Sequence, residues 1–121
     1  MVVRHDAAAF TVMAAERGAV AAVVESPQPL PLPQVGVPDA GKALQEVAAA
    51  WRQRFRIPVL GVTGSNGKTT LKEMMSAIMR AHVRQPGDDG GVLATWGNLN
   101  NHVGVPITLL WLRPEHQAAV I

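Results

Sequence analysis

Residues 61–70 read Gly61-Val62-Thr63-Gly64-Ser65-Asn66-Gly67-Lys68-Thr69-Thr70, and this glycine-rich run is the most informative part of the chain. An apolar segment at 57–60 precedes the run, and apolar residues at helical spacing follow it from Thr69. A strand, a glycine loop and a helix in this order are the context that a phosphate-binding loop requires. Glycines let backbone N–H groups turn toward an anion, and the following helix adds unpaired N–H groups with a partial positive charge. The sequence therefore predicts a polyphosphate site.

Two side chains of this run suit the same ligand. The ammonium group of Lys68 can reach the outer phosphates of a nucleotide, and the hydroxyl of Thr69 can ligate a magnesium ion. One position departs from the common pattern, because Val62 stands where a glycine is usual and the loop is one residue longer. The other interpretation is a glycine-rich turn before a core helix, and the strand and helix around the loop favour the phosphate site over it.

Strand-like and helical segments alternate along the rest of the chain. Helices are expected at residues 6–17, capped by Asp6, at 39–54, capped by Asp39, at 69–82, and at 105–112 with an interruption near Pro106. Buried strands are expected at 19–24, 57–62, 92–95 and 118–121, and a loop at 85–91. This alternation predicts an α/β fold with a mainly parallel sheet that helices cover on both faces.

Two patterns concern packing and connection. The helices at 39–54 and 69–82 each carry an apolar stripe, and packing against the sheet is expected even for the methionine-rich second stripe. The stripes are Leu44, Val47, Ala48, Trp51 and Phe55, then Leu71, Met74, Met75, Ile78 and Met79. Residues 27–38 hold five of the nine prolines, which predicts a stiff extended connector; a ligand for a proline-binding module is the alternative.

Composition excludes several classes of function. The 121 residues suit about one domain, and a net charge of +2 is too small to indicate a nucleic-acid partner. Arg52, Arg54 and Arg56 are interpreted as solvated cations at a helix C-terminus. There is no cysteine, and the four histidines lack the spacing of a zinc site. No apolar run is long enough to span a membrane and no signal peptide is evident, so a soluble cytoplasmic protein is expected.

A second polar segment, residues 95–106, follows the strand at 92–95. It reads Thr95-Trp96-Gly97-Asn98-Leu99-Asn100-Asn101-His102-Val103-Gly104-Val105-Pro106. We expect it at the same edge of the sheet as the glycine loop, where ligands of such sheets lie. Its asparagines could orient carboxylate or phosphate oxygens, or could cap the helix after Gly104, and the sequence favours neither interpretation. For Trp96 and His102 a surface position is expected.

Together the two segments resemble the Mur ligases, the ATP-dependent amide-bond-forming enzymes of peptidoglycan precursor synthesis. Residues 63–70 look like the glycine loop of that family, its extra residue included. The stretch 97–101 and its continuation at 104–110 are similar to the branch that joins D-alanyl-D-alanine to UDP-N-acetylmuramoyl-tripeptide. Residues 5–6, 19–25 and 72–74 also match that branch, so the resemblance extends over nearly the whole chain.

The resemblance implies a three-domain enzyme, of which this chain would be an inactive, monomeric fragment. Residues 1–38 would be the remnant of an N-terminal α/β domain that binds the UDP-linked substrate. Residues 39–121 would be the first part of a central P-loop-type ATPase domain. No nucleic-acid partner is implied.

The resemblance also implies a mechanism with named residues. A substrate carboxylate would attack the γ-phosphate of ATP to give an acyl phosphate, and the amine of D-alanyl-D-alanine would displace the phosphate. Lys68 would be catalytic by neutralising charge on the transferring group, and Thr69 would hold Mg²⁺. Asn98, Asn100 and Asn101 would position substrate or γ-phosphate. The ATP-binding residues would be Gly64, Ser65, Asn66, Gly67, Lys68, Thr69 and Thr70.

Other interpretations stay open. A generic phosphate-loop ATPase or kinase would need an acidic strand-end residue for magnesium, and only Glu25, upstream of the loop, meets that description. A relative of folylpolyglutamate synthase would share the loop but would not be expected to carry residues 97–101 in this form. A nucleotide-binding or structural relic of a truncated gene would have no enzymatic activity.

Overall fold

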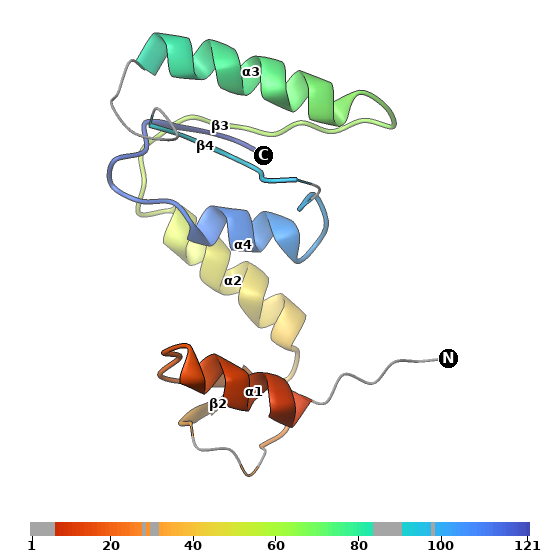
Figure 1. The fold of residues 1–121 in the computed structure, drawn as a ribbon, viewed down its shortest axis with the longest axis vertical. Helices are drawn as coiled ribbons and strands as arrows, with labels where there is room; N and C mark the ends of the chain where they lie inside the picture. The colour runs from red at the N-terminus through yellow and green to blue at the C-terminus, as the bar shows by residue number, and fades with distance from the viewer. Residues whose placement is uncertain (1–6, 28, 30–31, 84–90, 98) are drawn as a thin grey trace. The chain divides into compact units, whose positions relative to one another are not determined.

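The computed structural model describes residues 7–27, 29, 32–83, 91–97 and 99–121, in two compact units that divide between Ala43 and Leu44. The ribbon is drawn in Figure 1. The predicted helix cap Asp6, most of the predicted loop at 85–91, and Asn98 lie outside the described residues.

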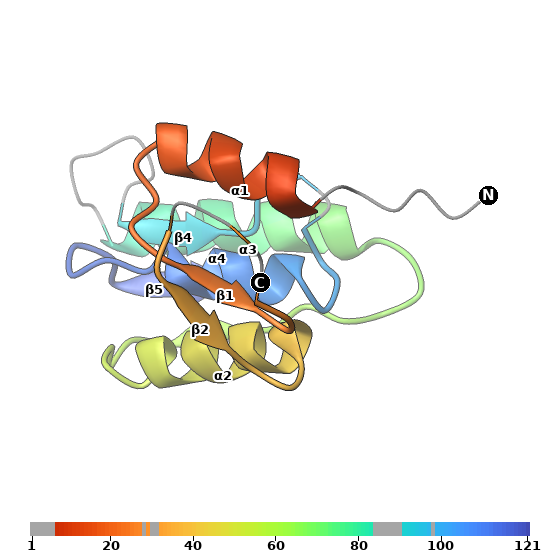
Figure 2. The same cartoon turned by 90° about the horizontal axis from the view of Figure 1, so that it is seen from below.

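The first unit holds α1 (Ala7–Glu16) and a pair of short parallel strands, β1 (Ala22–Val24) and β2 (Gln34–Gly36) (Figure 2). The helix ends before Gly18, whose φ of 94° suits glycine. The expectation of a buried strand at 19–24 was wrong in extent and burial, because only 22–24 pair and Val23 is 53% exposed.

The proline-rich segment is more than a connector, contrary to prediction, because its end forms β2. The three residues of β2 are not proline, so their N–H groups can pair. The pairing also uses the carbonyl of Pro33, which accepts from the N–H of Ala22 at 2.9 Å. A proline lacks only the donor, and one flanking a short strand is therefore compatible with the sheet.

Helix α2 (Ala40–Arg52) begins where the sequence predicted, at a cap formed by Asp39. The Asp39 carboxylate accepts the N–H of Lys42 at 2.8 Å. A second carboxylate, from Glu25, accepts the N–H of Ala40 at 2.9 Å. Both acceptors satisfy first-turn amides that have no partner within the helix.

The second unit is built on a three-stranded parallel sheet of β3 (Val59–Leu60), β4 (Val92–Ala94) and β5 (Ala118–Val120). The strand order is β3-β5-β4, so the last strand in sequence is the central one. Figure 1 shows α3 (Lys68–Val83) on one side of the strands and α4 (Gly104–Leu110) on the other. The predicted parallel sheet with helices on both faces is confirmed.

Alternate residues of β4 and β5 divide the core into two clusters. One cluster, on the side of α3, contains Val92, Ala118, Val120, Met75, Met79 and Val83. The other, on the side of α2 and α4, contains Leu93, Ala119, Leu112, Trp51, Phe55 and Leu109. The indole N–H of Trp51 donates to the carbonyl of Leu112 at 3.1 Å.

Three helical predictions need correction. On α3 only two of the five residues of the predicted stripe pack against the core, since Leu71, Met74 and Ile78 are 48, 58 and 66% exposed. Val47 on α2 is also 55% exposed. Pro106 does not interrupt α4, because it lies in the first turn, where a backbone N–H has no intrahelical acceptor.

The arginines at and after the C-terminus of α2 were predicted to be solvated, but two of them make contacts within the chain. The guanidinium of Arg52 donates to the carbonyls of Phe55 and Ile57, at 2.5 and 2.8 Å. That of Arg54 lies 5.0 Å from the centre of the Trp51 ring, a cation–π distance.

Candidate functional site: a glycine loop at the carboxyl edge of the sheet

The glycine loop connects the end of β3 to the start of α3. Gly64 and Gly67 have φ values of 145° and 73°, which side chains with a Cβ rarely adopt. The first helical hydrogen bond runs from the N–H of Leu71 to the carbonyl of Gly67, at 2.9 Å. The amides at positions 68–70 therefore have no acceptor within the helix and lie at its positive end.

The Lys68 side chain lies back along the loop. Its ammonium group donates to the carbonyl oxygen of Gly64. No carboxylate pairs with this ammonium in the described part of the chain, so its charge is available to an anion beside the loop. Thr69 follows at an exposed position.

The structure explains why Val62 can stand where a glycine is usual. Its N–H donates to the carbonyl of Ile121 at 2.6 Å, so the residue still belongs to the sheet ladder. Its side chain is partly buried against the cluster under α3. The loop proper begins one residue later, which accommodates the extra residue.

The glycine loop and the segment after β4 come together, because the carboxyl ends of parallel strands meet at one edge of a sheet. A cavity of about 30 Å³ lies between them, room for roughly two water-sized groups. It is lined by Val62, Lys68, Thr69, Lys72, Thr95, Gly97, Asn100 and Ile121.

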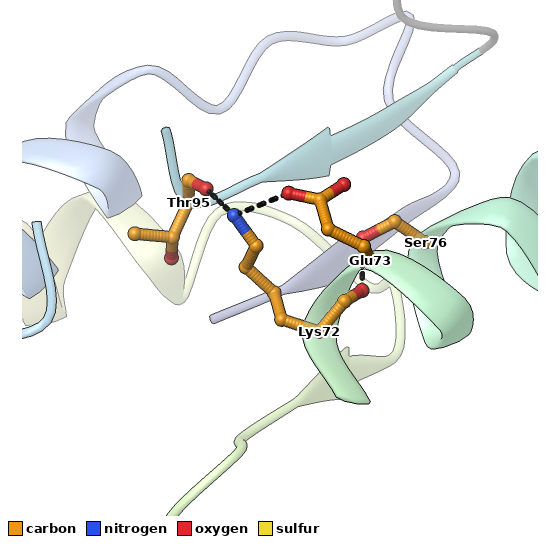
Figure 3. A network of polar contacts seen from close by, with 4 residues as sticks. All are labelled: Lys72, Glu73, Ser76 and Thr95. Atoms are coloured by element: carbon orange, nitrogen blue, oxygen red, sulfur yellow. Dashed lines mark hydrogen bonds and ion pairs between the residues drawn. The ribbon is translucent and has the colours of Figure 1, made fainter. Parts of the chain in front are cut away.

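Two lining residues, Lys72 and Thr95, were not assigned to the site from the sequence. Lys72 is 8% exposed, and its ammonium group donates to the carbonyl of Thr95 at 2.5 Å and contacts Glu73 at 2.8 Å (Figure 3). The hydroxyl of Ser76 donates to the Lys72 carbonyl at 2.7 Å. The spacing of Lys68 and Lys72, one helical turn, was the available signal.

The charge of Lys72 is shared with a carboxylate on the same helix. The hydrogen bond and the charge of Lys72 lower the pKa of Glu73 below its ordinary 4.5, and Arg80 contributes in the same direction. Desolvation opposes this shift. Glu73 itself is exposed, so solvent screens the pair.

The predicted asparagines have different positions. Asn100 lines the cavity, as a ligand-orienting residue would. The side-chain oxygen of Asn101 accepts the N–H groups of Val103 and Gly104, at 3.1 and 2.7 Å. This is the capping role that the sequence left open. Trp96, 78% exposed, and His102 are both on the surface, as expected.

Among the residues that the structure describes, no three His, Cys, Asp or Glu side chains are grouped as metal ligands. No helix in the same part of the chain is long and apolar enough to cross a membrane.

Comparison with known proteins gives a consistent result. Residues 62–121 match the model of the Mur ligase middle domain. The UDP-N-acetylmuramoyl-tripeptide–D-alanyl-D-alanine ligase of Escherichia coli K12 is 45% identical over 98% of this chain, which covers 25% of that protein. The ligase of the same name from Synechocystis is 42% identical over 96% of the chain and is likewise covered to 25%.

Solved structures agree. A crystal structure of MurF from Acinetobacter baumannii aligns with the whole chain at a TM-score of 0.82 and 39% identity, over 25% of its own length. The chain thus spans about a quarter of the length of the curated relatives that it matches.

Proposed function

Because this chain belongs to the Mur ligase family, we propose that its glycine loop binds the phosphates of ATP in the reaction named for its relatives. That reaction joins D-alanyl-D-alanine to UDP-N-acetylmuramoyl-tripeptide. One observation carries the proposal: Lys68, Thr69 and the free amides of the first turn of α3 meet at a cavity beyond the carboxyl ends of the strands. Anionic oxygens bind well at such a helix N-terminus.

The proposed reaction has two steps, a phosphoryl transfer and an acyl transfer. An oxygen of the tripeptide carboxylate bonds to the γ-phosphorus of ATP, and the bond from that phosphorus to the bridging oxygen breaks, releasing ADP. The amine nitrogen of D-alanyl-D-alanine then bonds to the acyl carbon, phosphate leaves with the bonding electrons, and the nitrogen loses a proton. The ammonium of Lys68 stabilises negative charge on the transferring phosphoryl group, where positioning and electrostatics dominate.

The backbone from Gly64 to Thr70 would wrap the β- and γ-phosphates. The positive φ values of Gly64 and Gly67 fit this role, because they let main-chain N–H groups face the ligand without a nearby Cβ. Thr69 would hold Mg²⁺ through its hydroxyl. This donor suits magnesium, which takes few protein oxygens together with substrate phosphates, and the ion would neutralise phosphate charge.

Asn98, Asn100 and Asn101 would orient oxygens of the substrate or of the γ-phosphate. Asn100 is supported by its place in the cavity wall. For Asn101 the capping contacts occupy the oxygen, so its NH₂ group would make the contact with ligand.

The two parts of the chain would have separate tasks. We assign residues 1–38 to a domain that binds the UDP-linked substrate and residues 39–121 to the ATP-binding domain. The boundary between the two compact units lies a few residues later, between Ala43 and Leu44 within α2. The boundary that we propose between the two functions therefore differs from the boundary between the compact units.

Nucleotide titration of the 121-residue chain tests the proposal. We expect heat of binding with MgATP in the calorimeter, with an affinity weaker than micromolar, and a loss of at least about tenfold in Lys68→Ala. The control is Lys42→Ala, because it removes a lysine of the first unit that belongs neither to the loop nor to the residues lining its cavity. Equal affinities of the Lys68→Ala variant and the unmodified chain would refute the assignment.

A further inference from the structure

The carbonyl of Thr95 is held by a side chain from another element. Thr95 follows β4 directly, and its N–H donates to the carbonyl of Val120 in the neighbouring strand at 2.9 Å. Its carbonyl oxygen accepts from the ammonium of Lys72 on α3 at 2.5 Å. Among the described residues Lys72 is the only donor to this oxygen. The residue at which the chain leaves β4 is therefore bound both to the sheet and to α3.

Packing alone does not account for a lysine at this position of α3. Lys72 is 8% exposed and lies on the same side of the helix as Met75 and Met79, which pack against the core. Burying an ammonium group costs free energy, so an apolar side chain would be better if filling space were the only requirement. Figure 3 shows the ammonium between the Thr95 carbonyl and the carboxylate of Glu73. The lysine thus adds a polar contact between this face of α3 and the segment after β4.

This contact joins the two walls of the cavity beside the glycine loop. Lys68 and Thr69 line the cavity from the start of α3, and Lys72 follows Lys68 by about one helical turn. Gly97 and Asn100 line the cavity from the segment after β4. The φ of Gly97 is 57°, so the chain turns soon after it leaves the strand. The position of this second wall therefore depends on the bond that Lys72 makes.

We propose that Lys72 is a positioning residue that holds the Thr95 carbonyl against α3 and thereby places Asn100. The side-chain NH₂ of Asn100 donates to an oxygen of the γ-phosphate of ATP, and Lys72 itself makes no contact with the ligand. The proposal rests on the proposed function, since the ligand is the nucleotide that the glycine loop would bind. The cavity of about 30 Å³ is lined by both Lys68 and Asn100 and has room for only a small group, which favours a terminal phosphate.

Binding of a non-hydrolysable MgATP analogue to the 121-residue chain tests this role. Lys72→Met keeps the aliphatic part of the side chain and removes the donor, and we expect it to weaken binding about tenfold. The matched control is Glu73→Gln, which removes the other contact of the ammonium and leaves its bond to Thr95. This control should bind within about twofold of the unmodified chain. Clearly tighter binding by Glu73→Gln would mean that the charge of Lys72 acts on the ligand directly, and would overturn the inference.

A double-mutant cycle separates positioning from charge and from stability. Asn100→Ala should weaken binding about tenfold. Adding Lys72→Met to Asn100→Ala should then weaken binding by less than about threefold more, because the side chain that Lys72 places is gone. Equal fold losses from Lys72→Met with and without Asn100 would refute the positioning role. An Asn100→Ala variant that binds like the unmodified chain would refute it as well.

Stability is controlled by measuring the melting temperature of each variant without ligand and titrating below the lowest of them. If Lys72→Met does not unfold cooperatively, Lys72→Gln replaces it in the cycle. Glutamine is also neutral, and its side chain is too short to hold the Thr95 carbonyl in the same place. The outcomes are then interpreted in the same way as for Lys72→Met.

Failure of the proposed function would look different, because the unmodified chain would then bind no nucleotide. The amide NMR signals of the ligand-free chain still measure the positioning role. In Lys72→Met the signals of Gly97 and Asn100 should shift or broaden. The signals of Gly64 and Gly67, in the glycine loop, should change less. Unchanged signals of Gly97 and Asn100 would overturn the positioning role, whether or not the chain binds nucleotide.

Discussion

Replacing Gly104 by alanine should destabilise the protein, although alanine is the better helix former. Gly104 is buried in the first turn of α4, and a Cβ there would lie 2.6 Å from the Cα, carbonyl carbon and oxygen of Leu99. Ordinary contacts begin at 3.4 Å, so these atoms would have to move by 3.4 − 2.6 = 0.8 Å. All three belong to the backbone, which cannot relieve the overlap by changing a rotamer.

The magnitude follows from two opposing effects. Alanine gains up to about 1 kcal/mol over glycine from helix propensity. Overpacking of a well-packed site costs about 1–3 kcal/mol, and a three-atom backbone overlap belongs at the upper end. We therefore expect a net loss of about 2 kcal/mol, or roughly 8–16 °C in melting temperature for a unit of this size.

The assay is thermal unfolding of the whole chain followed by circular dichroism. The matched control is Gly61→Ala in the same unit, because a Cβ at Gly61 would meet no atom within 4 Å and its φ is not in the left-handed region. The control should stay within about 0.5 kcal/mol of the unmodified chain. A Gly104→Ala variant as stable as Gly61→Ala would refute the close approach of α4 to residue 99.

Three further outcomes are expected. Asn101→Ala should lower stability by about 1 kcal/mol in urea unfolding, because the N–H groups of Val103 and Gly104 at the start of α4 lose their acceptor. Asn101→Asp keeps that acceptor, and an equal loss of stability in both variants would argue against the cap. The contact of Glu73 with Lys72 lowers the Glu73 pKa, so the stabilisation of the fold by this contact should be complete above pH 4.5 and vanish as the pH falls through the lowered pKa of Glu73. The measurement is the difference in melting temperature between a Glu73→Gln variant and the unmodified chain. A difference that stays the same from pH 7 to pH 3 would contradict this prediction. Arg52→Met should lower the free energy of unfolding by about 1–3 kcal/mol, because two carbonyls lose their hydrogen bonds, whereas Arg56→Met should leave it nearly unchanged. Comparable losses of stability in the two variants would mean that the Arg52 contacts are not the cause.

Local patterns in the sequence were sufficient for most of the second unit. The glycine loop, the start of α3 and the strand at β5 depend on short runs of residues whose conformational preferences agree with the fold. The cap at Asp39 was predictable for the same reason, since it involves an amide only three residues away.

Features that depend on distant segments were missed. Strand β2 forms because β1 lies beside it, and nothing in residues 34–36 alone indicates that partner. The apolar stripe on α3 has more residues than pack against the sheet, and the sequence spacing does not show which of them face the sheet. Lys72 and Thr95 lie 23 positions apart and meet only when β4 packs beside α3. Sequence patterns therefore predicted the loop that would bind phosphate but missed part of the wall opposite it.

The position of β5 in the middle of the sheet has a consequence for biosynthesis. Val59 pairs with Ala119, 119 − 59 = 60 positions later, and Val92 pairs with Ala118. On a ribosome that adds about 5–20 residues per second, β3 would therefore wait about 3–12 s for its neighbour. Until residues 118–120 emerge, the glycine loop follows a strand with no hydrogen-bonded partner in the described sheet, so the nucleotide site should form only after those residues have left the ribosome.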